Sequence, residues 1–479
     1  MLFNTPSFMV FLIAVLALYA AARTYTQRSG ILLVASFIFY ASWKPAYLLL
    51  LIASLSINYL FYSALTKNPS KPLLISAITL NLVVLAISKY IVFLTDNFIF
   101  VWSAVSGNQA SIPEWMHWAL PLGISFYTFH MLSVMIDVYR GQWTQRISLR
   151  TWTLYVTFFP HMVAGPILRA SELVDQLENL GPLRRADLRL GLFLFVGGLL
   201  KKLLLADHLG PIANIIYASP ENLTAIVAWL GTIAFALQIY FDFSGYSEMA
   251  IGLAAMFGVT LPRNFLYPYI SRNPREFWQR WHITLSRWLR DYLYVSLGGS
   301  RVSFSRNQCN LMLTMLLGGL WHGAAWTFVI WGLIHGLWLV AHRLLLRIYD
   351  GLGVLSRPAL SKALSLLGWP VTMAVVAFTW VFFRATSLES AQQICAAMLG
   401  LSDLGGKIVS LRGFEVVLIG FGSVVALLEP LIIRGCLLVN LVERWWTWSP
   451  LLRGVTYAAG VLTLVVFGGA PQKFIYFDF

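Results

Sequence analysis

Long apolar runs separated by short polar loops recur along almost the whole chain. In the first third they lie near residues 8–22, 31–43, 46–65, 72–95 and 119–138. Later runs lie near residues 151–168, 190–206, 224–241, 247–258, 311–347, 369–384, 414–434 and 454–468. Because a helix needs about 20 apolar residues to cross a bilayer, the pattern predicts an all-α polytopic integral membrane protein with about eleven to thirteen transmembrane helices.

The apolar runs are uneven in length, and many contain glycine or proline. Irregular backbone at membrane depth is tolerated only where it is buried in protein or lines a wet cavity. We therefore expect re-entrant and interfacial helices in addition to complete spans.

The charged residues between the runs indicate an orientation. Arg23 and Arg28 follow the first run and Lys67 and Lys71 follow the third, whereas the 96–118 loop contains no lysine or arginine. Basic loops normally remain in the cytoplasm. The N-terminus is therefore expected on the extracytoplasmic side of a multi-pass membrane protein.

The composition excludes several other classes of protein. Hydrophobic residues make up 58% of the chain and charged residues 11%, against roughly 25% charged in a soluble domain. The net charge of +14 would suggest nucleic acid in a soluble protein, but here the basic residues are explained by cytoplasmic loops. The three cysteines are far apart and form no CxxC, so neither a disulfide framework nor a zinc site is expected.

The segment 263–306 is unusually basic, with eight arginines and only two acidic residues. Part of it places apolar residues at helical spacing, which predicts a basic amphipathic helix in the membrane interface. The segment is either a plain anchor on anionic lipid or a cationic cytoplasmic mouth for an anionic ligand such as a phosphorylated cofactor. The apolar stripe comprises Trp278, Trp281, His282, Leu285, Trp288, Leu289 and Tyr292, with Arg280, Arg287, Arg290 and Asp291 on the other side.

His322 is the only ionisable side chain between residues 311 and 334. An ionisable group inside a membrane segment is a functional-site hypothesis by default, and a neutral imidazole is a common general base. Spacing alone supports equally a histidine that caps a broken helix, because small residues surround it: Gly318, Gly319 and Gly323.

His282 lies on the apolar stripe, where a lone histidine is more often a satisfied core residue. It gains interest because His322 follows in the next apolar segment. No third ligand recurs at a fixed spacing, so we expect no metal site. The acidic residues in apolar surroundings are expected to satisfy buried polar groups or to pair with arginines: Asp137, Asp242 and Glu248.

The chain ends in the aromatic tail PQKFIYFDF. Arg444 and Arg453 precede the last apolar run, so the tail is expected outside the cytoplasm. Either it is an interfacial aromatic anchor, or Tyr476 folds back into the protein and receives an acyl group.

The chain contains no GxSxG, HExxH, P-loop or GxGxxG motif, which removes support for common hydrolase, zincin and nucleotide-binding functions. Several stretches instead resemble the bacterial membrane-bound O-acyltransferases, and the alginate O-acetylation protein I branch most closely. The resemblance runs from about residue 30 to the end and is densest over 264–336. It rests on PLGISFYTFHMLSVMIDVYRG (121–141), FFPHMVAGPILR (158–169), QIYFDFSGYSEMAIGLAAMFG (238–258), NFLYPYISRNPREFWQRWHITLSRWLRDYLYVSLGGSR (264–301) and LGGLWHGAAWTFVIWGLIHG (317–336).

This resemblance implies a helical bundle around a central tunnel that joins the two membrane faces, in a bacterial inner membrane. One membrane-embedded domain over 1–479 would comprise peripheral helices (1–118), a core (119–347), C-terminal helices (348–468) and the extracytoplasmic tail (469–479). The invariant family histidine corresponds to His322 and the second family histidine to His282. The tail is similar to those of polymer-acetylating members, and it resembles the aromatic ending of a small peptide that partners the D-alanylating members, which keeps Tyr476 as a candidate acyl relay.

The function implied is O-acetylation of an extracytoplasmic polysaccharide, alginate or a similar exopolysaccharide. The donor would be acetyl-CoA or another acyl thioester, with no permanently bound cofactor, and an extracytoplasmic SGNH-like acetyltransferase would be the partner. His322 would act as general base, while His282 or a backbone amide steadies the thioester oxygen. Arg280, Arg287 and Arg290 would attract the phosphates of coenzyme A.

Two alternatives remain at this stage. A transporter or channel for an acyl group or polymer would also contain broken helices and intramembrane polar residues. An O-acyltransferase that acts on peptidoglycan, teichoic acid, lipid or protein would share the mechanism and differ only in the acceptor.

Overall fold

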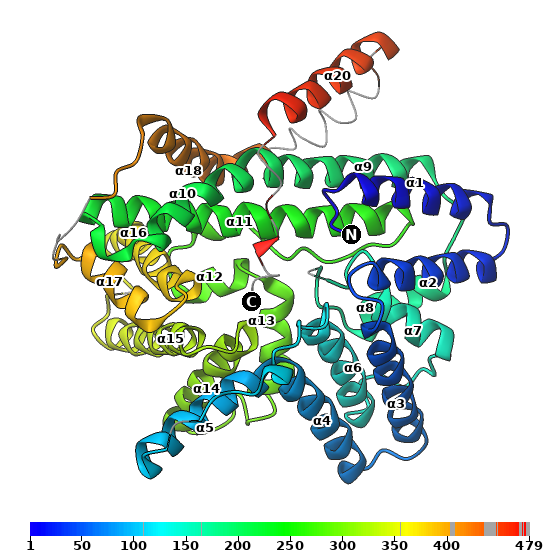
Figure 1. Ribbon diagram of the computed structural model, residues 1–479, viewed down its shortest axis with the longest axis horizontal. Coiled ribbons are helices and arrows are strands. Elements are labelled where there is room, and N and C mark those ends of the chain that lie inside the picture. The colour runs from blue at the N-terminus through cyan, green and yellow to red at the C-terminus, as the bar shows by residue number, and fades with distance from the viewer. Residues whose placement is uncertain are drawn as a thin grey trace. The chain divides into compact units, whose positions relative to one another are not determined.

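The computed structural model describes residues 1–108, 110–163, 165–354, 356–402, 408–434, 447, 449–468, 472, 474 and 475. Every regular element within these ranges is a helix (Figure 1). The expected all-α class is therefore confirmed.

The chain groups into two compact units, each built from separate stretches of sequence. The first unit comprises Met1–Val196 and Tyr246–Arg263, and the second comprises Gly197–Gly245 and Asn264–Phe479. Two helices contribute to both units: α9 (Arg185–Leu200) and α11 (Ala225–Met256).

The first unit is built around α6 (Ile124–Tyr139), of which nearly every side chain is buried. Four helices pack against it: α3 (Tyr47–Lys67), α4 (Lys71–Leu85), α7 (Leu149–Thr157) and α8 (Ala170–Glu178). A helix buried on all sides has no polar face, which explains why residues 119–138 read as a continuous apolar run. The unit also contains α1 (Pro6–Ala21), α2 (Tyr25–Ala41) and α5 (Ile91–Ser106).

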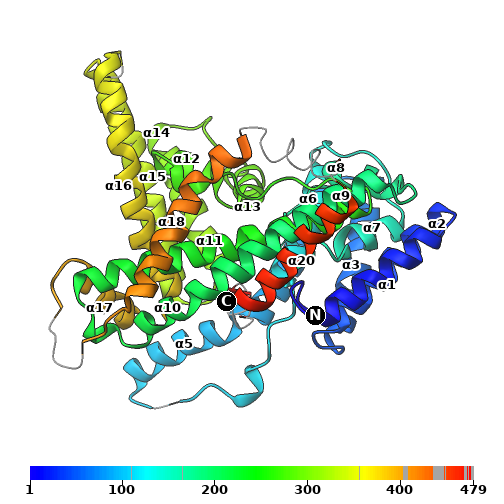
Figure 2. The same ribbon diagram turned by 90° about the horizontal axis from the view of Figure 1, so that it is seen from above.

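Among the described residues, nine helices belong to the second unit in addition to the shared α9 and α11 (Figure 2). Its helices are α10 (Asp207–Ala218), α12 (Pro274–Arg280), α13 (Ile283–Trp288), α14 (Phe304–His322), α15 (Trp326–Gly351), α16 (Pro358–Arg384), α17 (Leu388–Met398), α18 (Gly413–Arg434) and α20 (Pro450–Phe467). Two π-helical turns belong to the same unit: η3 (Lys201–Ala206) and η6 (Leu289–Tyr294).

Six helical segments in the described part are long and apolar enough to cross a membrane, which confirms a multi-pass membrane protein. The expected eleven to thirteen spans stay a prediction beyond these six, and α1 is apolar but shorter. The six are Tyr47–Lys67, Lys71–Ser106, Ala225–Met256, Trp326–Gly351, Pro358–Arg384 and Gly413–Leu431.

Helices α14 and α15 form a closely packed pair, because glycines line their contact. A Cβ atom at Gly319 of α14 would lie 3.0 Å from Cα of Gly332 in α15, closer than real Cβ atoms normally approach. The chain between the two helices, from Gly323 to Ala325, is extended at both ends. The apolar run near 311–347 is therefore two helices with a break immediately after His322.

The prediction of one continuous amphipathic helix in the 263–306 segment is wrong. The segment forms α12 and α13, separated at Trp281 and His282, and then the turn η6. His282 adopts a left-handed conformation with φ of 41°, which ends one helix and redirects the next. The apolar stripe is nevertheless buried at most positions: Trp281, His282, Leu285, Leu289 and Tyr292.

Candidate active site

His322 is the last residue of α14 and only 4% of its surface is exposed. Three aromatic rings enclose it, with centroids 5.0 Å (Trp321), 5.2 Å (Trp331) and 5.2 Å (Phe383) from the imidazole centroid. The tight α14–α15 pair brings Trp331 of α15 against the histidine, and α16 contributes Phe383. His322 thus terminates a broken helix, as one sequence interpretation proposed, and it is buried among aromatic rings.

His282 lies at the start of α13 and is completely buried. Its Nδ1 atom lies 3.1 Å from Oδ1 of Asn264, and its ring packs edge-on against Phe243 at 4.8 Å between centroids. Burial lowers the pKa of His282 to about 3, because an imidazolium would lose its hydration in this apolar environment. The ring is therefore neutral at physiological pH.

The two histidines selected from sequence lie together in the second unit. Their ring centroids are 6.5 Å apart, and Trp321 contacts both rings. Two buried imidazoles at this separation can hold a small reacting group between them, because a catalytic base must lie within hydrogen-bond reach of the proton it takes.

Asp242 is buried in α11 next to Phe243, which packs on His282. Its Oδ1 lies 2.9 Å from Nζ of Lys202, and the same Nζ lies 2.5 Å from Oδ1 of Asp207. Asp242 thus pairs with a lysine rather than with an arginine. We refer to Lys202, Asp207 and Asp242 as the buried triad.

The C-terminal segment reaches this region. The backbone N–H of Ile475 donates to Oδ2 of Asp242 at 2.8 Å, and the backbone of Gln472 bonds to Asp207. Phe474 is 1% exposed and its ring lies 5.9 Å from that of Phe243. Asp242 therefore satisfies a buried polar group, as expected. Tyr476 lies outside the described residues.

A second buried histidine pair lies in the first unit. The rings of His130 and His161 are 4.8 Å apart, and both side chains are fully buried. Nε2 of His161 lies 3.1 Å from the carbonyl oxygen of Tyr155, so it is tied to the backbone of α7. This contact suits a structural role.

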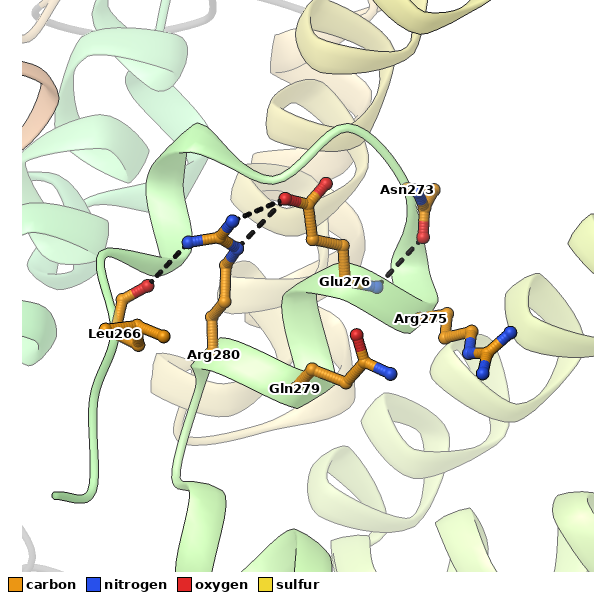
Figure 3. A pocket seen from close by; sticks show the side chains of 6 residues that line it. All are labelled: Leu266, Asn273, Arg275, Glu276, Gln279 and Arg280. Atoms are coloured by element: carbon orange, nitrogen blue, oxygen red, sulfur yellow. Dashed lines mark hydrogen bonds and ion pairs between the residues drawn. The ribbon is translucent and has the colours of Figure 1, made fainter. Parts of the chain in front are cut away.

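An open cavity of about 480 Å³ adjoins α12 (Figure 3). Arg280 reaches back to Glu276, at 2.7 Å between Nη2 and Oε1, and to the carbonyl oxygen of Leu266 at 3.0 Å. Arg275 points away from this pair and is exposed. The cavity is lined by Leu266, Asn273, Arg275, Glu276, Gln279 and Arg280.

Of the three arginines expected to bind phosphate, only Arg280 lines this cavity. Arg287 is exposed on α13, and Arg290 pairs with its neighbour Asp291 at 2.6 Å. Within the described ranges, no group of three or more histidine, cysteine or acidic side chains is arranged to hold a metal ion.

Sequence reasoning missed Asn264 and Lys202. Lys202 lies within the apolar run near 190–206, and a charge inside such a run is the signal that would have revealed it. Asn264 contacts His282 across 18 positions of sequence, and no periodic pattern relates the two residues.

The chain is similar to proteins of a family of membrane-bound acyltransferases. The model of the membrane-bound O-acyltransferase family matches residues 98–375. A probable alginate O-acetylase of Pseudomonas aeruginosa is 41% identical over 405 residues, covering 83% of this chain and 75% of that protein. A peptidoglycan O-acetyltransferase of Helicobacter pylori is 36% identical over 441 residues, covering 84% of this chain and 81% of that protein. A teichoic acid D-alanyltransferase of Bacillus subtilis is 30% identical over 232 residues, covering 46% of this chain and 58% of that protein.

Proposed function

This chain belongs to the membrane-bound O-acyltransferase family, and we propose that it transfers an acetyl group from acetyl-CoA at the cytoplasmic face to an extracytoplasmic hydroxyl. The acceptor would be alginate or a similar exopolysaccharide, because probable alginate O-acetylases are similar to this protein over most of the chain. The protein would lie in a bacterial inner membrane with its N-terminus outside and cooperate with an extracytoplasmic SGNH-like acetyltransferase.

The observation that carries the proposal is the buried pair of His282 and His322, 6.5 Å apart between ring centroids. The rings lie among tryptophan and phenylalanine side chains, which exclude water and so protect an activated thioester from hydrolysis. A transporter without bond chemistry would have no need of two buried imidazoles at one point.

The reaction requires a proton acceptor but no redox or metal chemistry. The acceptor oxygen attacks the carbonyl carbon of the thioester while His322 takes the hydroxyl proton. A carbon–oxygen bond forms, the carbon–sulfur bond breaks, and the proton ends on the departing thiolate to give a free thiol. A general base typically contributes about 10²- to 10⁴-fold, and holding both reactants together contributes a further large factor.

The cavity beside α12 is our candidate for the phosphate end of the donor. Arg275 and Arg280 line it, and guanidinium groups bind phosphate in a charge-assisted, bidentate manner. Arg280 is already bonded to Glu276, so Arg275 supplies more of the positive field at the cavity. Arg287 and Arg290 would act at longer range by attracting the anionic donor.

Tyr476 remains our candidate for a transient acyl carrier. Its described neighbours support the proposal, because Phe474 and Ile475 are buried and Phe474 packs on Phe243, which itself packs on His282. The phenol would attack the thioester first. A second hydroxyl would then take the acetyl group from Tyr476, which regenerates the phenol.

The test uses the purified full-length protein in nanodiscs with radiolabelled acetyl-CoA. Wild type should consume the thioester and acquire covalent label, whereas His322→Ala should do neither. Tyr476→Phe should lose the label, and Tyr349→Phe in α15 is the matched control that should retain it.

The outcomes separate the parts of the proposal. Label that persists in Tyr476→Phe but disappears in His322→Ala would move the acyl carrier to another residue. Unchanged thioester consumption in His322→Ala would refute the assignment of His322 as base.

A further inference from the structure

Asn264 is buried, with 1% of its surface exposed, and its side-chain oxygen contacts three groups. Oδ1 lies 3.1 Å from Nδ1 of His282, 3.3 Å from the backbone N of Thr284 and 2.8 Å from the hydroxyl of Thr284. In addition, the backbone carbonyl of Asn264 accepts from the backbone N–H of Ile283 at 2.9 Å. Asn264 therefore holds the ring of the left-handed His282 and the chain directly after it.

These contacts determine which nitrogen of His282 carries the hydrogen. A backbone N–H can only donate, so the Asn264 atom facing Thr284 N must be the amide oxygen and not the amide nitrogen. An oxygen that lies at hydrogen-bond distance from Nδ1 requires Nδ1 to be the donor. In a neutral imidazole the other nitrogen then carries a lone pair. Nε2 of His282 is consequently a proton acceptor.

Nε2 of His282 is buried, and no residue in the described part of the structure donates a hydrogen bond to it. The rings packed around it are those of Phe243, Phe265, Trp321 and His322. His322 is the only titratable or charged group among these recorded ring neighbours. A buried acceptor without a donor is costly to maintain, which points to a group that arrives with the substrate.

The separation of the two histidines indicates how they act together. With centroids 6.5 Å apart, even ring nitrogens that faced each other directly would be about 4 Å apart, beyond the reach of a direct hydrogen bond. One bridging hydroxyl or water spans such a gap by accepting from one ring and donating to the other.

We infer that Asn264 is a positioning residue that fixes His282 as a second proton acceptor beside His322. The inference rests on the proposed function. His322 takes the proton of the acceptor hydroxyl, and the resulting imidazolium donates to a bridging oxygen that donates in turn to Nε2 of His282. The proton is shared along this path until the thiolate takes it. Neutral His282 cannot donate at Nε2, so the thioester oxygen is steadied by a backbone amide.

The first test reads the tautomer directly and needs no activity. The full-length protein with ¹⁵N-histidine, in nanodiscs, should show a protonated Nδ1 and an unprotonated Nε2 for His282, assigned by comparison with His282→Gln. Asn264→Ala should lose this state. Thr284→Val removes another donor to the same Asn264 oxygen without touching His282, so it should keep the wild-type spectrum. A protonated Nε2 in the neutral wild-type ring would overturn the inference.

The second test measures the pH profile of thioester consumption. Asn264→Ala should lower kcat about 10²-fold or more, because the second acceptor loses its orientation, while Thr284→Val should stay within about threefold. Asn264→Asp keeps an acceptor oxygen but adds a negative charge, which favours imidazolium. The acidic limb of this variant should therefore move to higher pH, whereas Asn264→Ala should lose rate without such a shift, because its His282 stays neutral across the assay range.

A purely structural Asn264 would give a different result. Both Asn264 variants would then lower protein yield and thermal stability, and Asn264→Asp would leave the acidic limb unmoved. Retained activity in His322→Ala would refute the proposed function and leave the tautomer result standing. An inactive His322→Ala with a fully active Asn264→Ala would refute only the positioning role.

Discussion

Lys202 should be essential to stability because it is the sole cation of the buried triad. Its Nζ lies 2.5 Å from Asp207 and 2.9 Å from Asp242, and the three side chains are 3%, 0% and 1% exposed. In Lys202→Met the two carboxylates stay buried and lose their counter-charge. Removal of one partner of a buried pair costs about 3–5 kcal/mol.

The matched control is the triple variant Lys202→Met, Asp207→Asn, Asp242→Asn. It removes every charge but keeps side-chain oxygens that can accept from the backbone near Gln472 and Ile475. Replacement of a whole buried ionic group by neutral residues is often close to neutral in free energy. The free energy of unfolding of the triple variant should therefore lie within about 1–2 kcal/mol of the wild-type value and well above that of Lys202→Met.

The assay follows tryptophan fluorescence during heating in one fixed detergent. The apparent midpoint should fall by several degrees in Lys202→Met and recover in the triple variant. A single variant that melts with wild type would refute the reasoning. So would a triple variant as unstable as the single one, because packing of the lysine side chain would then matter more than its charge.

Three further changes have expected outcomes. His322→Ala should lower kcat by about 10²- to 10⁴-fold while leaving the melting midpoint near wild type, since the histidine acts as a base; a proportional loss of folded protein would contradict this. Gly332→Ala should destabilise the protein by about 1–3 kcal/mol, because its Cβ would meet the backbone of α14. Gly420→Ala is the control and should not destabilise it, since no atom lies within 4 Å of a Cβ at that position. Equal melting midpoints of the two variants would contradict the close helix contact. Arg275→Ala should raise KM for acetyl-CoA about tenfold with little change in kcat, and Arg287→Ala should raise it less; an unchanged KM in both would remove the phosphate site from α12.

Much of the fold could be predicted from sequence, and so could the two histidines that define the candidate site. Ionisable residues are rare in membrane segments, so His322 stood out against its neighbours, and the apolar runs located the helices. The break at His282 could not be predicted, because residues on either side of a left-handed position can keep the same periodic spacing. Asn264 was missed for a different reason: its contact with His282 depends on how two distant segments pack, and a single asparagine leaves no pattern.

The π-helical turn η3 bears on the evolutionary history of this chain. At its end the backbone N–H of Asp207 bonds to the carbonyl of Lys202, five positions earlier instead of the four of an α-helix. Such a turn accommodates one extra residue without rotating the helices on either side. Relatives that lack the insertion should therefore show a one-residue gap between the positions of Lys202 and Asp207, and their lysine and aspartate, four apart on an ordinary helix, could still pair. A gap at this point in an alignment would then mark the one-residue insertion in this chain, with the ion pair kept in both sequences, and it should not be closed as an alignment error.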